Sequence, residues 1–208
     1  MTNMKIGILG AGAIAHKMAE TVSSMEGAEV YAVASRSLEK AEDFAKKYQI
    51  PKAYGNYQEM VMDSSVDLVY VATPHSHHYE HVKLCLKNHK HVLCEKAFMI
   101  NSRQAEEVVR LAKEKKLLLA EAIWTRYMPS RALIREAVES GIIGEVTSLT
   151  ANLGYVIKDK ERLIESRLGG GALLDLGVYP INFALMVFGE DYAEVSAERI
   201  LSEQGVDL

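Results

Sequence analysis

The stretch Lys5–Ala15, KIGILGAGAIA, decides the fold of this chain. Its first part, Lys5–Leu9, is a short apolar run that predicts a buried strand. Apolar residues then recur every three or four positions from Ile14 to Met25, which predicts a helix directly after the strand. The stretch is therefore the strand, turn and helix that open a βαβ unit.

The turn within this stretch has the pattern G-x-G-x-x-A, formed by Gly10, Gly12 and Ala15. The first glycine permits a tight turn, the second lets the backbone approach a pyrophosphate, and the small third residue lets helix and strand pack. The helix N-terminus adds unpaired N–H groups and a positive dipole end. We expect a dinucleotide to bind here, whereas the alternative is a merely structural turn. The expected contacts are Gly10, Gly12, Ala13 and Ile14.

Alternating strands and helices continue to about residue 122. Apolar runs predict four further strands, at Glu29–Ala34, Asp67–Ala72, His91–Cys94 and Leu117–Ala120. Helices are expected between them: one capped by Ser37, one at Tyr79–Lys87, and one opened by a capping box of Asn101 and Gln104. This alternation predicts an α/β fold, a doubly wound parallel Rossmann sheet over residues 1–122.

Residues 123–208 follow a different pattern. Helices are expected at Pro129–Ser140 and Ala172–Phe188, and strands at Thr147–Leu153 and Glu194–Leu201. We interpret this part as a partial α+β domain, for which the family resemblance described below implies roles in substrate binding and dimerisation. So thin a sheet leaves an apolar face uncovered, so we expect either that the chain is truncated or that another subunit covers the face.

Composition limits the classes of function. The net charge of −4 and the pI near 6.0 argue against a nucleic-acid platform. No apolar run approaches the roughly 20 residues that span a bilayer, and no signal segment is evident. Cys85 and Cys94 have neither metal-ligand nor CxxC spacing, so we expect two buried, reduced thiols. We therefore expect a cytoplasmic protein with neither a membrane nor a nucleic acid as partner.

The end of the second strand selects the cofactor. NAD enzymes usually place an acidic residue about 20 positions beyond the third small residue of the motif. Here that position is Ser35, followed by Arg36, so no carboxylate repels a 2′-phosphate and a guanidinium is available to pair with it. The sequence favours NADP, with NAD as the alternative; Arg36 could equally be a solvated loop charge.

Two later segments carry candidate chemistry. Lys96 follows the strand His91–Cys94, at the sheet edge where ligands bind, and could bind the oxygen of a carbinol or carbonyl. Asp175 and Tyr179 are four positions apart and share a helical face, where they could bind a polyol and relay its proton. The alternatives are a surface lysine, an acid interacting with the helix dipole and an ordinary amphipathic tyrosine.

Together these segments resemble the Gfo/Idh/MocA oxidoreductases over essentially the whole chain. The resemblance rests on GAGAIA, ATPHSHH (Ala72–His78), HVLCEKA and GGGALLDLGVYPIN, and EAIWTRYMP (Glu121–Pro129) is similar to the dimeric dihydrodiol dehydrogenase branch. One departure is Ala97, which stands where the family's E-K-P motif has proline and leaves the stiffness of the Lys96 loop in question.

The resemblance implies an NADP-linked dehydrogenase, commonly dimeric, acting on a sugar, polyol or cyclic diol. It implies catalytic roles for Lys96, Asp175 and Tyr179. It adds Thr73, Pro74, His78, Glu95 and Lys96 as cofactor contacts and Trp124, Arg126 and Asn182 as substrate contacts. Arg126 could also simply face water. We expect no metal site, because His75, His77 and His78 read as loop histidines without a further ligand at metal spacing. The alternatives are a non-catalytic NADP-binding sensor and a truncated, inactive family member.

Overall fold

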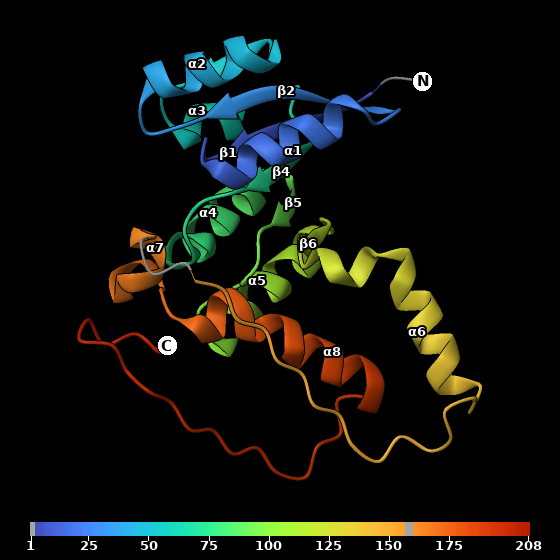
Figure 1. Ribbon diagram of the computed structural model, residues 1–208. Coiled ribbons are helices and arrows are strands. Elements are labelled where there is room, and N and C mark those ends of the chain that lie inside the picture. Colours follow the sequence, from blue (N-terminus) through green and yellow to red (C-terminus); the bar gives the residue numbers. More distant parts are fainter. Residues whose placement is uncertain (1–2, 157–159) are drawn as a thin grey trace. The chain divides into compact units, whose positions relative to one another are not determined.

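A six-stranded parallel sheet organises the first part of the chain (Figure 1). The computed structural model describes residues 3–156 and 160–208, which divide into two compact units, Met1–Ala122 and Ile123–Leu208. The strand order is β3-β2-β1-β4-β5-β6. The strands are β1 (Met4–Leu9), β2 (Ala28–Ala34), β3 (Lys52–Tyr54), β4 (Leu68–Val71), β5 (His91–Cys94) and β6 (Leu119–Glu121). The expected Rossmann sheet is confirmed, with β3 as an additional edge strand.

Helices cover both faces of this sheet. They are α1 (Ala13–Ser23), α2 (Leu38–Tyr48), α3 (Tyr57–Met62), α4 (His75–Lys87) and α5 (Ser102–Lys115). Alternate strand residues point to opposite faces. Val33 and Tyr70 therefore pack with residues of α1 and α2, whereas Ala34 and Val69 pack with residues of α3, α4 and α5. The two apolar clusters make the sheet doubly wound.

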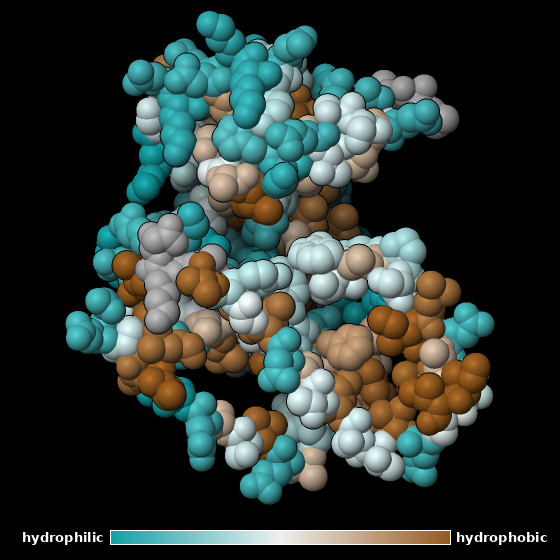
Figure 2. Space-filling view, in the orientation of Figure 1, coloured by the Kyte–Doolittle hydropathy of each residue, from teal (hydrophilic) through white to brown (hydrophobic). Residues whose placement is uncertain are grey.

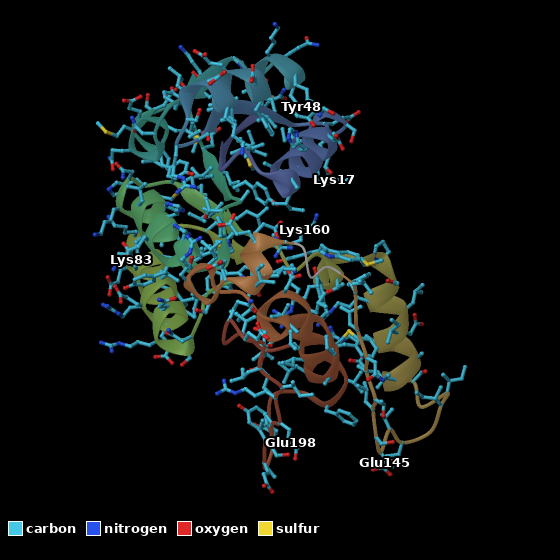
Figure 3. All side chains as sticks on the ribbon, turned by 60° about the vertical axis from the view of Figure 1, so that its left-hand side comes forward. Lys17, Tyr48, Lys83, Glu145, Lys160 and Glu198 are labelled. Atoms are coloured by element: carbon cyan, nitrogen blue, oxygen red, sulfur yellow. The ribbon has the colours of Figure 1, made fainter. Side chains whose placement is uncertain are left out.

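Polar side chains fix the ends and spacing of these helices. Ser37 accepts a hydrogen bond from the Lys40 N–H at 3.3 Å, and Asn101 accepts one from the Gln104 N–H at 3.0 Å, so both expected caps are confirmed. Lys83, labelled in Figure 3, pairs across to Glu107 of α5 at 2.9 Å. This ion pair therefore joins α4 to α5.

The second unit consists of helices joined by extended chain in its described residues. It contains α6 (Pro129–Glu139), α7 (Glu161–Ile164) and α8 (Val178–Phe188), together with 3₁₀ turns at Trp124–Tyr127 and Ser166–Leu168 and a π-helical turn at Leu173–Gly177. The expected strands Thr147–Leu153 and Glu194–Leu201 are wrong. A strand needs a hydrogen-bonded neighbour, and among the described residues of this unit a single bridge, Leu201 to Asp207, is formed. The α+β expectation is therefore corrected here to helices and extended chain.

Apolar side chains are unusually exposed in the second unit. Ile142, Val156 and Ile200 are 79%, 96% and 75% exposed, and Figure 2 shows hydrophobic surface gathered over α6. The span Ser166–Phe188, with a mean hydropathy of 1.6, is long and apolar enough to cross a membrane, which corrects the expectation that no run approaches this length. Length and hydropathy alone are a weak argument for a membrane span, because core helices of other proteins pass the same test. The bend at Gly169–Gly171 also interrupts the helix.

Candidate functional site: a dinucleotide turn, a braced lysine loop and a helix bearing Asp175 and Tyr179

The glycine turn after β1 has two glycines with different tasks. Gly10 has φ +103°, and a Cβ there would lie 2.9 Å from the Ala72 carbonyl oxygen and 3.1 Å from Thr73 Cγ2. Gly12 is the N-cap of α1 with φ −92°, and a Cβ there would meet nothing within 4 Å. The positive φ and the close neighbours therefore require glycine at position 10, whereas Gly12 leaves open space beside the N-terminus of α1.

This open space fits a pyrophosphate. The first turn of α1 has neither a side-chain cap nor an acidic residue, so its N–H groups, including those of Ala13 and Ile14, are available to an anion. Ile14 is 43% exposed, while Ala15 is completely buried against the sheet. The small third residue of the motif therefore does pack helix against strand.

Ser35 and Arg36 follow β2 at the same carboxyl edge. Ser35 is buried, donates its N–H to the Tyr54 carbonyl at 3.1 Å, and receives the Ser37 N–H on its hydroxyl at 3.4 Å. Arg36 is exposed. A fixed serine followed by an exposed guanidinium, with no carboxylate at either position, is a fitting environment for a 2′-phosphate.

The histidines of the ATPHSHH segment lie on α4, not in a loop. The helix begins at His75 directly after Pro74, which corrects the expected start at Tyr79. The neighbouring Thr73 hydroxyl lies 3.0 Å from His81 Nδ1. Burial lowers the pKa of His81 to about 4, and the charges of His77 and His78 contribute. Within residues 3–156 and 160–208, no group of three His, Cys, Asp or Glu side chains could hold a metal ion.

His78 connects the Thr73 turn to the lysine loop. Its side chain is fully buried, with Nε2 2.8 Å from the Thr73 carbonyl oxygen and Nδ1 2.8 Å from the Ala97 carbonyl oxygen. A neutral imidazole donates to one of these oxygens, and the imidazolium donates to both. Burial lowers the pKa of His78, and the two carbonyls oppose this. From this buried position His78 can influence a cofactor through the backbone that it holds.

Three side chains brace the loop that carries Lys96. Tyr70 donates its hydroxyl to Glu95, whose other carboxylate oxygen accepts the Lys96 N–H at 3.1 Å. Glu121 accepts the Phe98 N–H at 2.9 Å. Burial raises the pKa of Glu95 even though these hydrogen bonds lower it. Together with His78, these contacts hold the loop without the proline of the E-K-P pattern, which answers the question raised by Ala97.

The second unit brings the remaining candidates into two groups. Trp124 donates its indole N–H to the Tyr179 hydroxyl at 3.1 Å. Arg126 and Arg131 both donate to Asn182 Oδ1, at 3.3 and 3.4 Å. A cavity of about 280 Å³ is lined by Thr125, Met128, Arg131, Tyr179, Asn182 and Phe183, among others. The predicted substrate contacts thus lie around Tyr179, while joint action with Lys96 of the first unit stays a prediction.

The helix that carries Asp175 and Tyr179 starts in a crowded place. A Cβ on Gly170 would lie 2.4 Å from the Leu163 carbonyl oxygen, and one on Gly171 would lie 2.0 Å from Asp207 Oδ1. Asp207 also accepts the Leu173 N–H at 2.5 Å. Two of the three glycines are therefore explained by close approach of other segments, whereas the sequence suggested a flexible approach to a ligand.

Sequence reasoning missed several residues of these sites, namely Tyr70, His81, Glu121, Arg162 and Asp207. Glu121 stands in a recognised segment, but nothing in its spacing indicates that it binds the Phe98 N–H. The other contacts join residues 8 to 34 positions apart, and none of the motifs recognised in the sequence indicates them.

The fold and these sites define a protein of the dinucleotide-binding Rossmann class. The family described as "oxidoreductase family, NAD-binding Rossmann fold" matches residues 4–122, and the Gfo/Idh/MocA C-terminal domain matches residues 132–207. The chain belongs to the Gfo/Idh/MocA family, which confirms the resemblance inferred from its motifs.

Named relatives refine this placement. The chain is 40% identical over 206 residues to trans-1,2-dihydrobenzene-1,2-diol dehydrogenase of Xenopus tropicalis, and 38% identical over 207 residues to the human enzyme of that name. Each match covers 98% of this chain and 62% of the relative, so the chain spans less than two thirds of their length. These matches confirm the dihydrodiol dehydrogenase-like branch that the segment Glu121–Pro129 indicated.

Solved structures of NADP-bound proteins are similar to this chain in fold. KijD10, a 3-ketoreductase from Actinomadura kijaniata in complex with NADP, is 31% identical with a TM-score of 0.81, covering 90% of this chain and 56% of KijD10. A KijD10 variant with TDP-benzene and NADP has a TM-score of 0.87 at 27% identity, covering 99% of this chain and 64% of that one.

Proposed function

We propose that the protein transfers a hydride between NADP and the CH–OH carbon of a sugar, polyol or cyclic diol. The observation that carries this proposal is the open space at Gly12 beside the uncapped start of α1, at the same sheet edge as Arg36. The NADP complex of KijD10 and the names of the diol dehydrogenases support the cofactor and the substrate class. NAD is the alternative cofactor.

The nicotinamide supplies the hydride chemistry when it is bound, and the chain supplies aim and electrostatics. In this proposal Lys96 donates a hydrogen bond to the substrate oxygen and its charge favours a developing alkoxide. Tyr179 moves the proton of that oxygen, and Asp175 orients Lys96 or a neighbouring hydroxyl. The hydrogen bond from the Trp124 indole orients the Tyr179 hydroxyl.

Binding and turnover are tested separately. Fluorescence titration with NADPH and NADH measures cofactor affinity, and a screen of polyols, aldoses and cyclic diols with NADP measures turnover. Lys96→Met is expected to abolish turnover, while Lys87→Met, at an exposed position ending α4, leaves it unchanged. Turnover by Lys96→Met contradicts the mechanism, and tight binding without any turnover by the wild type favours a sensor or an inactive family member.

We also propose that the protein is a cytoplasmic homodimer with neither a membrane nor a nucleic acid as partner. Two buried, unbridged cysteines support a cytoplasmic location, and a pI near 6.0 supports the absence of a nucleic-acid partner. The exposed apolar side chains of the second unit support association. Sedimentation of the purified protein and fractionation of expressing cells test these points; a monomer or a membrane-bound protein contradicts them.

A further inference from the structure

The carboxylate of Asp175 is withdrawn from water yet bound by an arginine from another segment. Asp175 is 4% exposed, and its Oδ1 accepts a hydrogen bond from Arg162 Nη1 at 2.9 Å. The Arg162 side chain is 47% exposed, so its guanidinium reaches from the surface to a buried acid. Nothing in the motifs of the sequence indicates this pair.

Arg162 itself is held in place through α7, which begins directly after Lys160 (Figure 3). The neighbouring Leu163 is buried, and its carbonyl accepts the Gly171 N–H at 2.9 Å. Because Gly170 has no Cβ, that carbonyl can approach the glycine turn closely. The backbone that carries Arg162 is therefore fastened to the start of the helix that carries Asp175.

Asp175 lies in the π-helical turn Leu173–Gly177, not in a regular α-helix. Such turns often occur at functional sites, and they change the direction in which their side chains point. The hydrogen bond from Arg162 to Oδ1 restrains this carboxylate from a segment outside the turn.

We propose that Arg162 is a positioning residue for the hydride-transfer reaction and acts by orienting the Asp175 carboxylate. This inference rests on the proposed function, in which Asp175 orients Lys96 or a substrate hydroxyl. Arginine suits the task because its guanidinium is planar and always charged, whereas the lysine ammonium is a point charge on a flexible stem.

Three variants of the complete protein test the role. Arg162→Gln is expected to lower kcat about tenfold to a hundredfold, as small misplacements of catalytic groups do, without changing the dissociation constant of NADPH. Arg162→Lys is expected to restore part of kcat. Arg167→Gln is the matched control, because Arg167 lies in the next turn and pairs with Glu161 and Glu165 at the surface. It is expected to keep wild-type kcat.

A double-mutant cycle with Asp175→Asn separates positioning from general damage. If Arg162 acts through Asp175, Arg162→Gln lowers kcat no further once Asp175 is replaced. Wild-type kcat in Arg162→Gln, or losses that multiply in the double variant, overturn the inference. If Arg162→Gln fails to fold, the comparison uses Arg162→Lys.

The wild type, Arg162→Gln, Asp175→Asn and the double variant are also unfolded in urea, which tests the contact without measuring turnover. Coupling between the two positions in unfolding supports the contact, and its absence overturns the inference. If the wild type turns over no substrate while coupling persists, the proposed function fails instead. The two failures are therefore distinguishable.

Discussion

Replacing each glycine of the first turn with alanine should separate stability from cofactor binding. Gly10→Ala forces a side chain into φ +103° and places its Cβ 2.9 Å from the Ala72 carbonyl oxygen. A left-handed residue costs about 1–2 kcal/mol and overpacking about 1–3 kcal/mol, so we expect a loss of about 2–5 kcal/mol in the free energy of unfolding. With a slope near 2 kcal/mol per molar urea, the midpoint falls by about 1–2.5 M.

Gly12→Ala should behave in the opposite way. Its φ of −92° suits alanine and its Cβ meets nothing, so the free energy of unfolding should change by no more than about 1 kcal/mol, the usual cost of a poorer N-cap. The methyl group, however, fills the space that a pyrophosphate needs. NADPH affinity should fall at least tenfold, or about 1.4 kcal/mol.

Urea unfolding followed by circular dichroism and NADPH titration followed by fluorescence measure the two quantities in both variants. Equal destabilisation by the two substitutions would refute the assignment of strain to Gly10 alone. Wild-type NADPH affinity in Gly12→Ala would refute the placement of the pyrophosphate at the start of α1.

Three further predictions concern the same sheet edge. The pKa of His81 is about 4, below the ordinary 6.5, so between these values the unfolded chain binds more protons than the folded chain. The free energy of unfolding should therefore fall by about 3 kcal/mol as pH drops from 6.5 to 4. In urea unfolding across this pH range, His81→Asn should flatten the decline, whereas His89→Asn, at an exposed position, should not. Arg36→Glu should weaken NADPH binding about tenfold or more, as loss of a charge-assisted bond of about 1.5–3 kcal/mol implies, and should affect NADH less; equal losses in parallel titrations would count against a 2′-phosphate site. Glu121→Ala removes the acceptor of the Phe98 N–H, so kcat should fall at constant NADPH affinity and Glu121→Gln should restore it; a wild-type kcat in the alanine variant would remove Glu121 from the loop's support.

The first unit could be predicted from local sequence because local rules govern it. Apolar runs formed the buried strands, and Ser37 and Asn101 formed the expected caps. The short edge strand Lys52–Tyr54 escaped because three residues carry too little periodicity. The start of α4 was misplaced although Pro74, which suits a helix N-terminus, stood directly before it.

The second unit could not be predicted as well, because strands depend on partners. Thr147–Leu153 alternates as a strand does, yet no neighbouring strand pairs with it among the described residues. The candidate site shows a similar limit. The position of Lys96 follows from the end of a strand. His78, Tyr70 and Glu121, which support its loop, lie 19 to 25 positions from the loop residues that they bind and leave no local pattern.

The carboxylate of Asp207 at the start of the Asp175 helix has a consequence for engineering the chain. Because it binds the Leu173 N–H from 34 positions further along, while Val206 beside it is buried, the helix is completed by a segment outside itself. A chain trimmed before Val206 should therefore lose order at Gly171 and Leu173, far from the cut in sequence. Loop grafting between Tyr192 and Leu201, where the chain is exposed and extended, should leave the same helix undisturbed.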